Sequence, residues 1–232
     1  MLTPAEAEAL ALSAKVAFWC MVTGLLPGVA LAWLLARGRF PGKALLDALV
    51  HLPMVLPPVV PGYLLLLAFG RQGPAGQWLN ETFGLNLSFH WTGAVLASLV
   101  MGLPLLVQPV RLSFQLIDSR LEQASRSLGA GPWRTFLTIT LPLAAPGILV
   151  GAILAFSRSL GEFGATITFV GNIAGETRTL PLAIYSYIQQ PGGEAPAWRL
   201  ILISVGLALA ALLASNALTR RLQRQLGYRD HA

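Results

Sequence analysis

The chain has 232 residues, of which 55% are hydrophobic and only 11% are charged. An average soluble domain carries about 25% charged residues, so this chain lacks the charge to cover a water-soluble surface. We therefore expect one helical bundle embedded in a lipid bilayer. The apolar content excludes a disordered or collagen-like chain, and the single cysteine, Cys20, excludes a disulfide scaffold.

Five stretches are long and apolar enough to cross a membrane as helices, which requires about 20 mostly apolar residues each. We predict spans at about residues 16–36, 48–69, 92–110, 139–161 and 200–219. The first is expected to be a retained anchor, because its apolar core is longer than that of a cleavable signal. A further apolar stretch, 163–175, is too short to cross and predicts an interfacial, re-entrant or buried segment.

The distribution of positive charge predicts the orientation of these spans. If the amino end lies outside, the inner segments 37–47, 111–134 and 220–232 hold eleven of the sixteen Lys and Arg residues. This asymmetry satisfies the positive-inside rule, so we expect a periplasmic amino end and a cytoplasmic carboxyl end. The net charge of +6 does not form a clustered basic face with stacking aromatics, which argues against a nucleic-acid partner.

The second span contains four prolines within nine residues, at positions 53, 57, 58 and 61. Each internal proline removes a backbone donor and clashes with the preceding turn, so this span is predicted to bend. In lipid the freed carbonyls need partners from neighbouring helices or from a wet cavity. The bend therefore indicates either a segment beside a translocation path or a purely architectural kink.

Two small-xxx-small pairs, Gly24 with Gly28 and Gly147 with Gly151, indicate close helix packing, within the subunit or at a dimer face. Cys20 lies in an apolar span and is expected to act as a small buried hydrophobe. The three histidines lie in separate segments, and neither a phosphate loop nor a catalytic triad pattern is present. We therefore predict no metal site, no cofactor and no catalytic residues.

Arg158 and Glu162 are ionisable groups at the end of the fourth span, where charge is costly and usually faces a cavity or another charge. Their spacing of four places them on one helical face. With Ser159 and Thr166 they predict either a polar pathway lining, in which Arg158 attracts an anion, or a structural ion pair. A third hypothesis, a proton relay in a stand-alone secondary carrier, finds no support from an internal repeat.

The loop at 118–138 predicts two short helices. Asp118 or Ser119 is a suitable cap for the first, with Leu121, Ala124 and Leu128 on one face, and Gly129 and Gly131 end it before Pro132 starts the second. Such helices, on the basic side of the membrane, suit docking onto a soluble partner. An amphipathic connector lying in the membrane interface is the alternative.

In this loop Gly129 is followed after nine residues by Ile139, Leu141 and Pro142, which resembles the coupling loop of binding-protein-dependent ABC-transporter permeases. That family usually opens the loop with Glu-Ala-Ala. Here Gln123, Ala124 and Ser125 occupy those places, and Glu122 lies one position early. The resemblance implies that ATPase coupling involves these positions: Glu122, Gln123, Ala124, Gly129, Ile139, Leu141 and Pro142.

Four other segments, 40–47, 51–63, 161–166 and 175–179, resemble molybdate permeases of this family. Sulfate permeases are similar at 161–166 and in the coupling loop, whereas 51–63 and 175–179 look more like the molybdate branch. The resemblance implies an all-α, five-span permease of the type I importer fold, forming a single domain over 1–232 in the bacterial inner membrane. It implies a non-catalytic homodimer that works with two cytoplasmic ABC ATPase subunits and a periplasmic molybdate-binding protein. Molybdate, and tungstate with it, is the expected substrate, and sulfate or thiosulfate is the alternative. An intramembrane enzyme is disfavoured by the missing catalytic residues.

Overall fold

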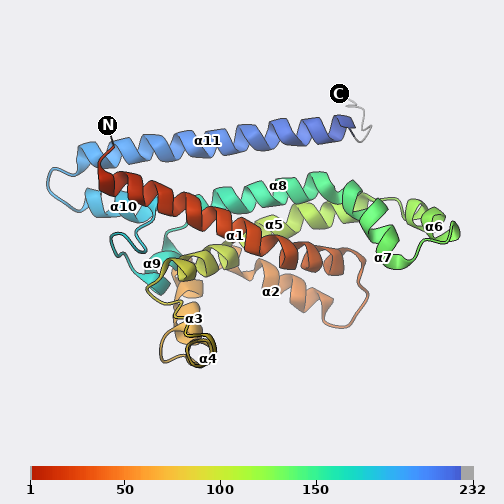
Figure 1. Cartoon of the computed structure of the whole chain (residues 1–232), viewed down its shortest axis with the longest axis horizontal. Coiled ribbons are helices and arrows are strands. Elements are labelled where there is room, and N and C mark those ends of the chain that lie inside the picture. The colour runs from red at the N-terminus through yellow and green to blue at the C-terminus, as the bar shows by residue number, and fades with distance from the viewer. Residues whose placement is uncertain (1, 226–232) are drawn as a thin grey trace.

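The computed structural model describes residues 2–225, which form a helical bundle. Four long helices run along its long axis (Figure 1): α1 (Pro4–Arg37), α5 (Trp91–Leu116), α8 (Leu141–Leu160) and α11 (Glu194–Gln225). The shorter elements are α2 (Lys43–Val55), α3 (Val59–Phe69), α4 (Pro74–Phe83), α6 (Ser119–Ser127), α7 (Pro132–Thr135), the π-helix η1 (Phe136–Thr140), α9 (Gly164–Val170) and α10 (Leu180–Ile188).

Among the described residues, four helices are long and apolar enough to cross a membrane, and α2 with α3 supplies a fifth crossing if that bent pair is one span. The axes of α2 and α3 differ by 114°. The all-helical membrane fold predicted from composition is therefore confirmed. α11 begins beside the start of α1 and runs to the opposite end of the bundle (Figure 1), which agrees with an odd number of crossings.

The prolines account for the bend in the second span. Pro53 lies inside α2, which ends at Val55, and Pro58 is the N-cap residue of α3. Small residues then allow α9 to approach the bend closely. A Cβ added at Gly164 would lie 2.6 Å from the Cβ of Pro58, and one added at Gly62 would lie 2.7 Å from the carbonyl oxygen of Ala165.

The core lies where α5 packs between α1 and α8. Leu106, Val107, Val110 and Phe114 of α5 are almost completely buried there. All four glycines of the two pairs face α5: Gly24, Gly28, Gly147 and Gly151. An added Cβ at Gly28 would collide with Leu106, and one at Gly151 would lie 2.5 Å from the Leu106 carbonyl oxygen. These contacts confirm helix packing within the subunit.

The end of the bundle that holds the start of α1 is tied together by polar contacts. Arg199 at the start of α11 pairs with the buried Glu6, with 2.8 Å between Nη2 and Oε1. The backbone N–H of Leu180 donates to Ser13 Oγ at 2.6 Å. The short helix α9 packs against α3 and α5, and Phe169 is completely buried. Of the three possibilities for 163–175, the structure favours a buried segment.

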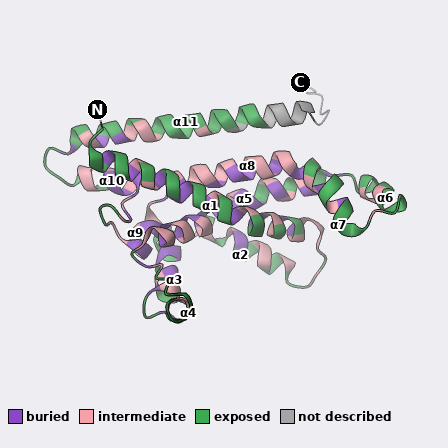
Figure 2. Cartoon of the chain, in the orientation of Figure 1, coloured by how far each residue is buried: buried purple, intermediate pink, exposed green. Residues whose placement is uncertain are grey.

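The outer surface is apolar where lipid is expected. Figure 2 shows α11 exposed along most of its described length, whereas α1, α5 and α8 are buried on the sides that face one another. The exposed apolar residues of α11 include Trp198, Leu202, Val205, Leu209 and Leu213. A helix that exposes this much apolar surface is stable in a bilayer and aggregates in water.

Candidate functional site

The loop between α5 and α8 forms the two short helices that its sequence predicts. The Asp118 carboxylate caps α6, accepting from the backbone N–H of Arg120 at 2.9 Å. At the other end Gly129 has a positive φ of 84°, its N–H donates to the Arg126 carbonyl, and the next N–H donates to the Ser125 carbonyl. This is a Schellman ending, in which the left-handed position suits glycine. α7 then begins at Pro132.

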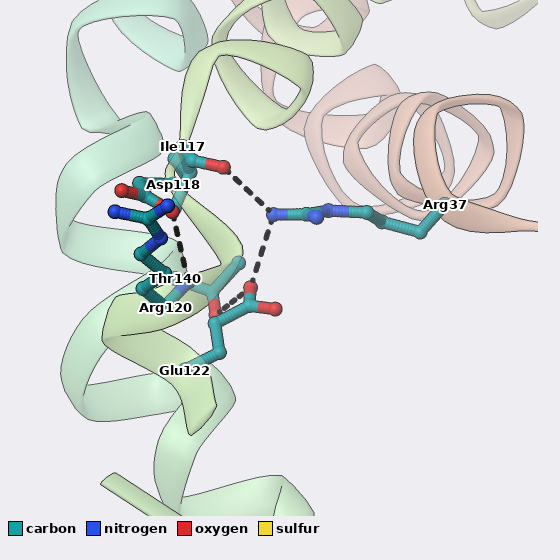
Figure 3. A network of polar contacts seen from close by, with 6 residues as sticks. All are labelled: Arg37, Ile117, Asp118, Arg120, Glu122 and Thr140. Carbon is teal, nitrogen blue, oxygen red and sulfur yellow. Dashed lines mark hydrogen bonds and ion pairs between the residues drawn. The ribbon is translucent and has the colours of Figure 1, made fainter. Parts of the chain in front are cut away.

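Glu122 turns inward from α6 and joins three segments of the chain (Figure 3). Its Oε1 lies 3.2 Å from Nη2 of Arg37, at the end of α1, and accepts a hydrogen bond from Thr140 Oγ1 at 2.8 Å. The same Arg37 nitrogen donates to the Ile117 carbonyl at 3.4 Å. The side chain of Glu122 is only 19% exposed, so this carboxylate is engaged inside the subunit.

The other residues that were predicted to couple to an ATPase follow Glu122 along one end of the bundle. Gln123 and Ala124 are exposed on α6, Ile139 lies in η1, and Leu141 and Pro142 form the first turn of α8. Several large apolar side chains of this loop are also exposed: Leu121, Leu128, Trp133 and Leu137. Exposed apolar side chains on a polar loop are typical of a protein-binding surface.

Arg158 and Glu162 form an ion pair, with 2.7 Å between Nη1 and Oε2. The Glu162 side chain is 1% exposed and the Arg158 side chain is 30% exposed. The second carboxylate oxygen of Glu162 accepts from the backbone N–H of Ala165 at 2.9 Å, in the first turn of α9. The pair therefore braces the connection between α8 and α9, yet the guanidinium remains partly accessible.

The accessible side of Arg158 faces a cavity of about 180 Å³ at the bend of the second span. α2 and the α2–α3 break contribute Pro53, Met54, Leu56 and Pro58, and α5 contributes Met101 and Leu105. Apart from Arg158 the lining side chains are apolar, so the guanidinium is the charged group available to an anion there. Both readings of Arg158, pathway lining and ion pair, are thus compatible with one geometry.

The two other residues predicted beside this pair are buried: Ser159 on α8 is 7% exposed and Thr166 on α9 is 1% exposed. Neither lines the cavity that Arg158 faces. Within residues 2–225 no cluster of His, Cys, Asp and Glu has the arrangement of a metal site.

Sequence reasoning missed two residues of the Glu122 network, Arg37 and Thr140. The sequence indicates Arg37 only as a positive charge of an inner segment, and Arg37 lies 85 residues before Glu122. Thr140 is an ordinary residue between Ile139 and Leu141. A single sequence carries no signal for such a distant pairing, because it depends on how α1 packs beside the loop.

The chain is similar to known proteins over most of its length. The family described as "Binding-protein-dependent transport system inner membrane component" matches residues 28–224. The molybdenum transport system permease protein ModB of Escherichia coli (strain K12) is 56% identical over 227 residues, covering 98% of this chain and 99% of that protein. The sulfate transport system permease protein CysT of the same organism is 36% identical over 199 residues, covering 86% of this chain and 71% of that protein.

A solved bacterial ABC transporter involved in the import of the acidic polysaccharide alginate has a chain with the same fold. The TM-score is 0.74, with 16% sequence identity and coverage of 95% of this chain and 80% of that chain. At this identity the likeness concerns the fold alone.

Proposed function

Because the chain belongs to the family of binding-protein-dependent transport system inner membrane components, we propose that it is the permease subunit of an ATP-driven molybdate importer. The observation that carries this proposal is the 56% identity to a molybdenum transport permease over 98% of the chain. The subunit is non-catalytic, and a partner ATPase hydrolyses ATP. Its place is the bacterial inner membrane, where its apolar helices are stable.

We assign the loop at 118–138 to the contact with the ATPase. The exposed side chains Leu121, Leu128 and Trp133 supply apolar contact area at one end of the bundle. The cap at Asp118 and the Schellman ending at Gly129 keep α6 a defined rigid element. A rigid element can transmit the closure of two ATPase subunits to the helices behind it, and such bundles switch between discrete arrangements rather than deforming continuously.

The translocation path is proposed to run past the cavity that Arg158 faces. Its guanidinium offers an oxyanion a charged donor, while the apolar side chains of Met54, Met101 and Leu105 offer nothing that holds the anion tightly. Pairing with Glu162 weakens the positive field of Arg158 further. Weak attraction suits a permease, because conduction requires that the ion also leaves.

We propose that two copies of the chain surround this path, with two ATPase subunits at the loop end and a molybdate-binding protein at the end that holds Glu6 and Arg199. The bend at α2–α3 exposes Val55, Val59 and Tyr63, and Leu56 and Pro58 of the same bend line the cavity. A second copy packed there would cover these apolar side chains and close the path on its open side.

The alternative anion is sulfate or thiosulfate. The identity of 36% to the sulfate permease, against 56% to the molybdenum permease, favours molybdate. Tungstate is expected to follow molybdate, because the two oxyanions have the same charge and tetrahedral shape.

The test is uptake into proteoliposomes that contain the permease with its ATPase and its binding protein. We expect ATP-dependent uptake of labelled molybdate, competition by equimolar tungstate, and little competition by excess sulfate. Matched vesicles without the ATPase, given a proton gradient, are the control. Uptake in that control would refute an ABC permease, and equal competition by sulfate would refute the assignment to molybdate.

A further inference from the structure

Glu122 connects the coupling loop with two other segments of the chain through an ion pair and a hydrogen bond. α6 carries Glu122, α1 carries Arg37, and η1 carries Thr140 immediately before α8. One oxygen, Glu122 Oε1, accepts from both partners, at 3.2 Å from Arg37 Nη2 and 2.8 Å from Thr140 Oγ1 (Figure 3). The same carboxylate oxygen thus links α6 to the end of α1 and to the residue directly before α8.

Arg37 also contacts the segment that connects α5 with α6. Its Nη2 donates to the carbonyl of Ile117, the C-cap residue of α5. The guanidinium thus spans the point where the chain leaves α5 and enters α6. The Arg37 side chain is 28% exposed and that of Glu122 is 19% exposed. Charge-assisted hydrogen bonds in such a shielded place are stronger than those on an open surface.

The rest of α6 has little else that holds it to the bundle. No residue of α6 itself is buried, and the side-chain bond that joins it to α7 runs between Ser125 Oγ and Thr135 Oγ1 at 3.2 Å. Glu122 is thus the ionic link of α6 to α1. Without this ion pair, a partner that moves α6 would displace the loop and would displace α1 and α8 less.

The π-helix η1 lies between the contacts of Glu122 and the helix that reaches the proposed translocation path. π-Helical turns are frequent at functional sites, and η1 leads directly into α8, whose far end carries Arg158. Arg158 lies 18 residues after Thr140, which corresponds to about 27 Å at about 1.5 Å per residue. Thr140 therefore lies directly before the helix that carries the guanidinium facing the cavity.

We propose that Arg37, through Glu122 and Thr140, is the positioning residue that couples movement of the loop helix α6 to the first and fourth spans. This inference rests on the proposed function, since it assumes that an ATPase moves α6. It also gives Glu122 a role: its carboxylate is used inside the subunit, while Gln123 in the next position is exposed.

The experiment compares Arg37→Gln with the native permease in the complete complex, reconstituted with ATPase and binding protein. Two rates are measured on the same vesicles: ATP hydrolysed and molybdate taken up. We expect ATPase assembly and hydrolysis to persist, and the molybdate transported per ATP to fall about fivefold or more, the range of typical coupling between sites. Arg37→Lys keeps the cation and is expected to restore most of the ratio.

Two further variants separate coupling from simple stabilisation. Glu122→Gln should lower the ratio as Arg37→Gln does, and the double variant should lower it no further, because both remove the same contact. Arg39→Gln is the matched control: Arg39 is exposed, and the structure shows no ion pair for it among the residues it describes. It should transport as the native protein does.

The outcomes are distinguishable. If Arg37 has only a structural role, Arg37→Gln will lower the amount of assembled complex and leave the molybdate transported per ATP unchanged. That result would overturn this inference but not the proposed function. Additive losses in the double variant would also overturn it. If the native complex shows no ATP-driven molybdate uptake, the proposed function itself fails and takes the inference with it.

Discussion

Removing Arg158 should destabilise the permease far more than removing Arg158 and Glu162 together. In Arg158→Gln the buried carboxylate of Glu162, 1% exposed, loses the cation 2.7 Å away. Breaking a buried ion pair on one side costs about 3–5 kcal/mol. We take the lower end, about 3 kcal/mol, because Arg158 is 30% exposed to the cavity. That corresponds to a change of about 150-fold in the unfolding equilibrium.

The assay is thermal unfolding of the purified permease in detergent. For a chain of this size about 3 kcal/mol lowers the melting temperature by about 6–12 °C. The control is Arg158→Gln with Glu162→Gln. Here the glutamine carbonyl at 162 still accepts from the Ala165 N–H, and no charge is left buried. We expect its melting temperature to lie within about 3 °C of the native value, since replacing a whole buried pair is often neutral.

The same double variant tests whether Arg158 also serves the anion. We expect it to be stable and yet slow in molybdate uptake, because the cavity has lost its charged donor. Uptake restored to the native rate would show that the pair only braces α8 and α9. A single variant as stable as the double variant would refute the reasoning about the buried charge.

Two further predictions concern glycines. Gly129→Asp should lower ATP-driven uptake about 5–30-fold while membrane insertion, measured by fractionation, stays normal, because the positive φ of 84° strains a non-glycine residue by about 1–2 kcal/mol. Gly129→Asn should lose less, because asparagine is the non-glycine residue found at this helix-ending position. Equal losses in the two variants would argue against a conformational cause. Gly147→Leu should lower the melting temperature, since an added Cβ meets Ser113 and lies 2.6 Å from the Pro109 carbonyl oxygen and overpacking costs about 1–3 kcal/mol. Gly206→Leu, on an open face of α11, is its control, and an equal loss there would refute the packing argument.

The sequence by itself determined the features that depend on local chemistry. Scarce charge in runs of about 20 residues requires membrane helices, and four prolines in nine residues require a bend, found at 114°. The cap at Asp118, the ending at Gly129 and the restart at Pro132 were also predictable, because each depends on the backbone preferences of one residue.

The tertiary structure alone decided which of the distant residues meet. Arg158 and Glu162 were predictable as a pair from their spacing, but the cavity beside them is built from α2 and α5, which no local pattern connects. Likewise Arg37 and Glu122 meet across 85 residues only because α1 ends beside the loop. Local propensity acts over a few residues, whereas the packing of α1, α5 and α8 brings distant side chains together. Packing therefore decided that Arg37 meets Glu122 and that Arg158 faces a cavity.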